Sequence, residues 1–120
     1  MKAGRELDAL IAEKVMGLTR HDESYVAEGV GKVLRFVWRD GCGTCVYSGD
    51  MFLPHYSADI AAAWEVVEKA DLWSLYGSIG DGPYRACIQF EDREGLMTAD
   101  TAPLAICLAA LKAVSQEGQG

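Results

Sequence analysis

The last apolar stretch, residues 101–114, constrains the fold more than any other part of the sequence. Thr101 is typical of a residue that begins a helix, and Pro103 is tolerated in the first turn. Large apolar side chains then spread around much of the helix, at Leu104, Ile106, Leu108, Leu111 and Val114. A helix without a wholly polar side must be covered by other elements, so we expect it to be the most buried helix of the protein.

Two further helices are predicted, each with a single apolar stripe. Residues 5–16 place Leu7, Leu10, Ile11 and Val15 on one side, and Gly17 is suited to end that helix. A second helix is expected to begin at Ser57 as N-cap and to end near Lys69. Its stripe comprises Ile60, Ala63, Trp64 and Val67.

Alternating patterns predict strands between these helices. Residues 32–39 place Leu34, Phe36 and Trp38 on a buried face, and a turn at 40–43 leads to a short strand at 45–48. Residues 72–79 and 84–91 form a second predicted pair around a turn at 80–83. Residues 19–31, 49–56 and 92–100 are expected to be loops. The fold class is therefore α+β, with three helices around a small, mainly antiparallel sheet.

Length and charge narrow the class of protein. A chain of 120 residues suits one domain, 1–120. The net charge of −7 argues against binding to long nucleic acid or to an anionic membrane surface. Lys2 and Arg5 are followed by acidic, amphipathic sequence and not by an apolar signal segment, so we expect a cytoplasmic protein.

Three segments together carry a family resemblance: residues 10–17 (LIAEKVMG), 56–69 (YSADIAAAWEVVEK) and 102–111 (APLAICLAAL). In this order they resemble the small phage and prophage proteins of the phage ABA sandwich domain family. The resemblance implies a layered α/β/α sandwich and a phage or prophage origin. It supplies no catalytic or binding residue.

The sequence Cys42-Gly43-Thr44-Cys45 has the spacing of a zinc knuckle or of a redox pair. Further zinc ligands would have to come from His21, His55, Cys87 or Cys107, which form no second pair. Reduced turn cysteines are therefore the favoured interpretation, and we expect no metal and no cofactor.

A ligand site is predicted from a second set of side chains. Arg35, Arg39 and Arg85, with Gln89, are expected on one face of the sheet, where guanidinium groups suit phosphate or carboxylate. His55 and Tyr56 precede a helix N-terminus, which favours an anion. Trp73 is the tryptophan expected to be partly exposed. The alternatives are arginines paired with acidic residues on a solvated face, and a segment that merely begins a helix.

No nucleophile triad, phosphate loop or helical histidine pair is recognisable in the sequence, so we expect no enzymatic activity. The leading hypothesis is a phage accessory protein that sequesters a small anionic, nucleotide-like host defence signal in the host cytoplasm. One alternative is a protein-interaction module that inhibits a host protein, and another is a small zinc-stabilised domain. Surplus apolar surface favours a homo-oligomer in each case.

Overall fold

A computed structural model describes residues 2–77 and 83–115. The chain divides into two compact units. The first, here called the helix–sheet unit, comprises Met1–Met16 and Pro54–Gly120, and the second, the hairpin unit, comprises Gly17–Leu53. The single domain expected over residues 1–120 stays a prediction. None of the helices within the described ranges has the length and apolar character needed to cross a membrane.

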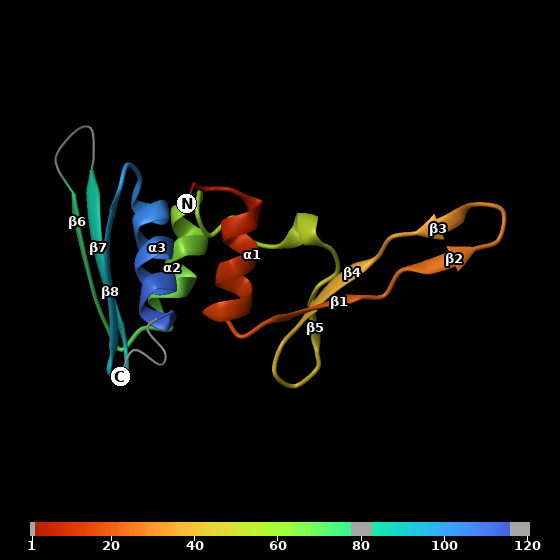
Figure 1. Cartoon of the computed structure of the whole chain (residues 1–120), viewed down its shortest axis with the longest axis horizontal. Helices are drawn as coiled ribbons and strands as arrows, with labels where there is room; N and C mark the ends of the chain where they lie inside the picture. The colour runs from red at the N-terminus through yellow and green to blue at the C-terminus, as the bar shows by residue number, and fades with distance from the viewer. Residues whose placement is uncertain (1, 78–82, 116–120) are drawn as a thin grey trace. The chain divides into compact units, whose positions relative to one another are not determined.

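The helix–sheet unit contains a three-stranded antiparallel sheet (Figure 1). Its order is β6 (Leu72–Gly77), β7 (Tyr84–Phe90) and β8 (Arg93–Ala99). The sequence predicted β6 and β7, while their connecting turn at 80–83 falls largely outside the described residues. The loop expected at 92–100 is wrong, because most of that segment is β8, which pairs along its whole length with β7.

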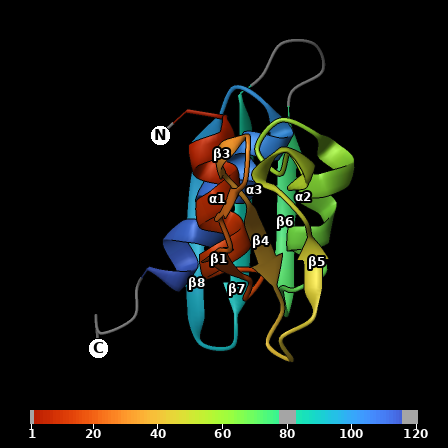
Figure 2. The same ribbon diagram turned by 90° about the vertical axis from the view of Figure 1, so that its right-hand side faces the viewer.

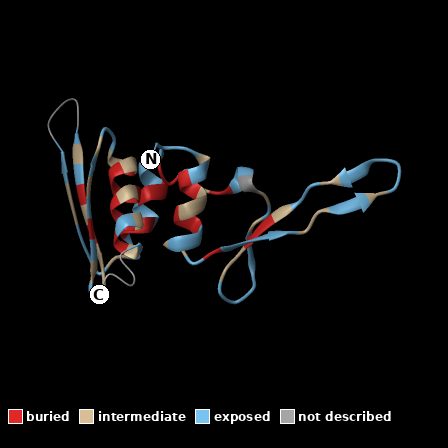
Figure 3. Cartoon of the chain, in the orientation of Figure 1, coloured by how far each residue is buried: buried red, intermediate tan, exposed pale blue. Residues whose placement is uncertain are grey.

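Three helices lie on one side of this sheet: α1 (Arg5–Lys14), α2 (Ile60–Val67) and α3 (Ala102–Val114). Figure 3 shows buried residues concentrated on α3 and on the neighbouring helices. The α+β class is confirmed. The single small sheet is wrong, because the described chain contains three separate sheets.

The contact between α3 and the sheet depends on small residues. The wholly buried positions of α3 include Ala105, Ala109, Ala110 and Ala113, whereas its leucines are only half-buried. A Cβ atom added at Gly95 of β8 would lie 1.9 Å from the carbonyl oxygen of Ala109. The backbones of helix and strand therefore approach more closely than any larger residue at position 95 would permit.

The structure corrects the predicted start of α2. Asp59, and not Ser57, is the N-cap, and its carboxylate accepts a hydrogen bond from the backbone N–H of Ala61. The buried positions are Ala62, Ala63, Val66 and Val67, so the apolar stripe is rotated from the one expected. Trp64 is 39% exposed, and its ring lies edge-on to Trp73 with centroids 4.9 Å apart. The predicted cap at Thr101 agrees with the structure, because its hydroxyl accepts a hydrogen bond from Leu104 N–H. Helix α1 ends earlier than expected, with Val15 and not Gly17 as its C-cap, and Gly17 follows with φ of 74°.

The hairpin unit has two antiparallel ladders. One sheet has the order β1 (Thr19–Asp22), β4 (Phe36–Arg39), β5 (Cys45–Tyr47). The other pairs β2 (Tyr25–Ala27) with β3 (Gly31–Val33), and a 3-10 turn, η1, follows at Asp50–Phe52.

Two strand predictions in this unit need correction. The loop expected at 19–31 is wrong, since it contains β1 and β2. The strand expected at 32–39 is interrupted between β3 and β4, where Leu34 is 66% exposed and not buried. Val37 and Trp38, neighbours on opposite faces of β4, are both buried, so each face of β4 contributes a buried side chain.

Candidate functional site

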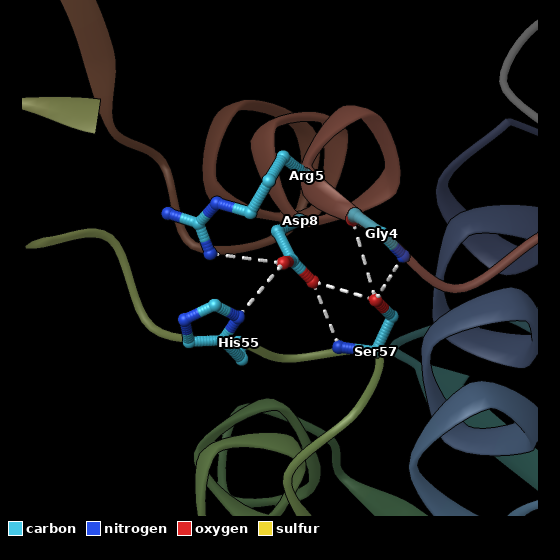
Figure 4. A network of polar contacts seen from close by, with 5 residues as sticks. All are labelled: Gly4, Arg5, Asp8, His55 and Ser57. Atoms are coloured by element: carbon cyan, nitrogen blue, oxygen red, sulfur yellow. Dashed lines mark hydrogen bonds and ion pairs between the residues drawn. The ribbon is translucent and has the colours of Figure 1, made fainter. Parts of the chain in front are cut away.

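A network of polar contacts in the helix–sheet unit is centred on Asp8, in the first turn of α1 (Figure 4). Its side chain is 1% exposed. One carboxylate oxygen accepts hydrogen bonds from the backbone N–H of Ser57 at 2.8 Å and from the Ser57 hydroxyl at 2.7 Å. The other accepts from the Arg5 guanidinium at 3.0 Å, and His55 Nδ1 lies 4.0 Å from it. The buried carboxylate is thus supplied with donors from two distant segments.

Ser57 completes this network and explains why it does not cap α2. Its hydroxyl accepts a hydrogen bond from Gly4 N–H at 2.9 Å while donating to Asp8. The residue is wholly buried, so the hydroxyl is shielded from any substrate in solvent. The Asp8–Ser57 pair therefore joins α1 to the segment before α2, and its geometry is that of a structural joint.

Cys107 lies close enough to this network for the charge of Asp8 to act on it. Burial raises the pKa of the Cys107 thiol to about 12, and the Asp8 carboxylate adds to that shift. Because a raised pKa keeps the thiol protonated at neutral pH, Cys107 is unsuited to act as a nucleophile or as a metal ligand.

Four of the predicted ligand residues belong to the helix–sheet unit. The His55 side chain is 61% exposed beside Asp8, whereas Tyr56 is 1% exposed and lies in the core. Trp73, in β6, is 48% exposed, in agreement with its expected partial exposure. Arg85 is exposed on β7, next to Tyr76 of β6.

The arginines expected on one sheet face do not share a sheet. Arg85 belongs to the β6–β7–β8 sheet, Arg39 belongs to the β1–β4–β5 sheet, and Arg35 lies between β3 and β4. Arg39 donates to Glu23 at 2.7 Å and to the carbonyl of Gly43 at 3.0 Å. The hydrogen bond from Arg39 lowers the pKa of the Glu23 carboxyl, and the same bond raises the pKa of Arg39. Arg39 is thus already engaged within its own unit.

Arg35 is placed differently. Its backbone is fixed, since its N–H donates to Ser24 Oγ at 3.0 Å and its carbonyl accepts from Glu23 N–H at 2.8 Å. Among the described side chains, none forms an ion pair with its guanidinium. It lines a groove of about 360 Å³ within the hairpin unit, whose lining is Leu34, Arg35, Phe36, Ser48, Gly49 and Met51.

This groove was only partly predicted. Arg35 was identified from its residue type, but Leu34 and Phe36 were assigned to the buried face of a strand. Met51 carried no signal at all, because it comes from a segment expected to be a loop. The Phe36 ring also contacts a second cation, since the Arg20 guanidinium lies 3.9 Å from the ring centroid.

Cys42 and Cys45 are both exposed around the β4–β5 turn. The Asp40 carboxylate orders this turn by accepting from the N–H groups of Cys42 and Thr44, each at 2.9 Å. Within the described ranges, no three His, Cys, Asp or Glu side chains are grouped as metal ligands would be. Reduced turn cysteines stay the prediction and zinc binding stays the alternative, which metal analysis of the purified protein would test.

The described part of the chain is that of a small α+β protein. A crystal structure of a phage protein from Bacillus cereus has a similar fold, with a TM-score of 0.61. The two chains are 27% identical, and the similarity covers 94% of this chain and 92% of that one. The phage ABA sandwich domain matches residues 9–111, and the chain therefore belongs to this family of phage proteins. The resemblance seen in the sequence is confirmed. Comparison with curated proteins gave no match.

Proposed function

We propose that this phage protein acts without catalysing a reaction, by sequestering a small anionic, nucleotide-like host defence signal in the host cytoplasm. The Arg35 groove is the proposed site. The observation that carries the proposal is the combination of a guanidinium unpaired among the described residues with an apolar lining at Leu34, Phe36 and Met51.

This combination suits a ligand that has an anionic part and a flat apolar part. A guanidinium can bind a phosphate through two parallel hydrogen bonds. A base or a similar ring can pack on the exposed side chains of Leu34 and Met51 and against the half-buried Phe36. A groove of about 360 Å³ is also within the usual size range of small-molecule sites.

Charge distribution supports the hairpin unit as the place where an anion binds. The segment Gly17–Leu53 holds four of the 11 Lys and Arg residues and five of the 18 Asp and Glu residues. Its net charge is therefore −1, whereas the whole chain carries −7. An anion is repelled less by this segment than by the rest of the chain.

Binding without catalysis is favoured because the described hydroxyl, carboxylate and thiol groups closest to a reactive arrangement are buried. Ser57 and Asp8, which form the one hydroxyl–carboxylate pair described above, are buried and mutually satisfied. The thiol of Cys107 is held protonated by burial. A protein of this kind would act stoichiometrically, by lowering the free concentration of its ligand.

The test is a thermal-shift and calorimetric screen with cyclic dinucleotides, cyclic ADP-ribose, ADP-ribose and NAD. A ligand at 100 times its dissociation constant should stabilise the protein by about 2.7 kcal/mol. Arg35→Gln should abolish that shift. Lys32→Gln, which removes an exposed cation of the same unit outside the groove, should preserve it. If none of these compounds binds, or if both variants bind equally, the proposal is wrong.

A second candidate function, inhibition of a host protein by direct binding, is favoured by the β2–β3 hairpin. Val26 and Val30 are 80% and 76% exposed there, which is unusual for β-branched apolar side chains. A host protein captured by the wild-type chain should be lost with Val26→Asp and retained with Arg35→Gln. The opposite pattern would favour the groove.

A further inference from the structure

The β6–β7–β8 sheet has one face that no described helix covers. Helices α1, α2 and α3 all lie on the other side (Figures 1 and 2). The strand register arranges the uncovered side chains in three rows, which we call the open face. The rows are Tyr76–Arg85–Thr98, Ser74–Cys87–Leu96 and Leu72–Gln89–Glu94.

The open face is more apolar than the solvated face of an antiparallel sheet usually is. Leu72, Tyr76 and Leu96 are 64%, 65% and 42% exposed, and they occupy all three rows. Burial on the opposite side of the same strands confirms the alternation, since Ala86, Ile88 and Gly95 are buried beneath the helices. The open face therefore exposes apolar area that a partner could remove from water.

The charge of the open face is balanced, unlike that of the chain. It contains one cation, Arg85, and one anion, Glu94, whereas the whole chain carries −7. These two charges lie in opposite outer rows, with the Ser74–Cys87–Leu96 row between them. Such an arrangement is self-complementary under a two-fold rotation that exchanges the outer rows.

We propose that a second copy of this chain docks on the open face, sheet against sheet. The two-fold axis lies in the interface and runs across the strands along the middle row. Arg85 of one protomer then lies over the row that holds the partner's Gln89 and the partner's Glu94. The same contact forms a second time with the two protomers exchanged. Tyr76 meets the partner's Leu72, and Leu96 meets the partner's Leu96.

This pairing places apolar groups on apolar groups and opposite charges near one another, as interfaces between sheets require. The pairing would allow a chain of net charge −7 to self-associate, because the surfaces that meet are neutral while the remaining acidic groups face solvent. The inference does not depend on the Arg35 groove, which belongs to the hairpin unit.

The experiment is sedimentation equilibrium on the full chain and on charge-reversed variants. We expect wild type to be dimeric at about 100 µM. Arg85→Glu alone and Glu94→Arg alone should each weaken the dimer at least about tenfold, because like charges then meet across the two-fold axis. The double variant, Arg85→Glu with Glu94→Arg, should recover most of that loss.

Matched controls are available at Glu65 in α2 and at Lys69 in the turn that follows it, away from the open face. Lys69→Glu and Glu65→Lys make charge changes of the same size at exposed positions and should leave the dimer unchanged. Circular dichroism of every variant would establish that it is folded. A monomeric wild type at this concentration would overturn the proposal, and so would a double variant no tighter than the single ones. A wild type that is monomeric alone but captures a host protein through Leu96 would assign the face to that partner instead.

Discussion

The close approach of α3 to Gly95 leads to the sharpest prediction about stability. In Gly95→Ala, the new methyl group would lie 1.9 Å from the Ala109 carbonyl oxygen and 2.7 Å from the Ala113 nitrogen. Ordinary van der Waals contact begins near 3.4 Å, so the helix or the strand must move by about 1.5 Å. Both obstacles are backbone atoms of a helix, which cannot rotate away as a side chain can.

The loss in the free energy of unfolding can be estimated from the usual cost of adding methyl groups to a packed core. Extra methyl groups in packed cores usually cost about 1–3 kcal/mol, and rigid surroundings bring the value to the upper end. Replacing glycine also restricts the unfolded chain, which offsets about 0.4–1 kcal/mol. We therefore expect Gly95→Ala to lower the free energy of unfolding by about 2–2.6 kcal/mol.

Urea denaturation followed by far-ultraviolet circular dichroism would measure this loss, because all three helices belong to the helix–sheet unit. Gly77→Ala is the matched control in the same sheet. Its methyl group would lie 2.6 Å from the Tyr84 ring, which can rotate, so we expect a loss below about 1 kcal/mol. Equal effects of the two substitutions, or a Gly95→Ala protein within about 0.5 kcal/mol of wild type, would refute the close-contact reasoning.

Two further predictions concern the Asp8 network and its neighbour. Ser57→Ala removes a donor to buried Asp8 and the acceptor of Gly4 N–H, so it should lower the free energy of unfolding by about 1–3 kcal/mol, whereas exposed Ser115→Ala should change it little. An unchanged denaturation midpoint for Ser57→Ala would contradict the stabilising role of the Asp8–Ser57 pair. Cys107, with a pKa of about 12, should be the thiol slowest to react with a disulfide reagent in the native protein. Unfolded Cys107 loses its proton near pH 9 and the folded form retains it, so this residue makes stability fall as the pH rises from about 9 toward 12. A Cys107→Ala variant with an identical alkaline stability profile would count against that assignment.

The sequence predicted the elements that have a strong one-sided pattern. Helix α3 and strands β6 and β7 were found because their apolar residues repeat at helical or strand spacing. Strand β1 was missed because all four of its residues are exposed and give no alternation. Strand β8 was missed because glycine usually indicates a loop. At Gly95 the missing side chain instead allows the backbone of α3 to approach the strand.

The candidate site was less predictable for a related reason. Ser57 has the residue type of a cap, but its partner Asp8 is 49 positions away, and local patterns carry no information about such a contact. Arg35 and Arg39 occupy equivalent positions in the alternating pattern of residues 32–39, so the sequence does not distinguish them. Only the fold reveals that Glu23 engages Arg39 and that Arg35 lines a groove beside Met51.

The β2–β3 ladder has a consequence for the lifetime of the protein in a cell. It consists of three residue pairs, Tyr25–Val33, Val26–Lys32 and Ala27–Gly31, and a two-stranded ribbon of this length is barely stable by itself. Its amide protons should exchange with solvent long before those of α3. Among the described residues, we therefore expect a protease to cut first at the exposed turn that contains Gly29. A ligand or protein that orders this hairpin would therefore also protect the phage protein from degradation.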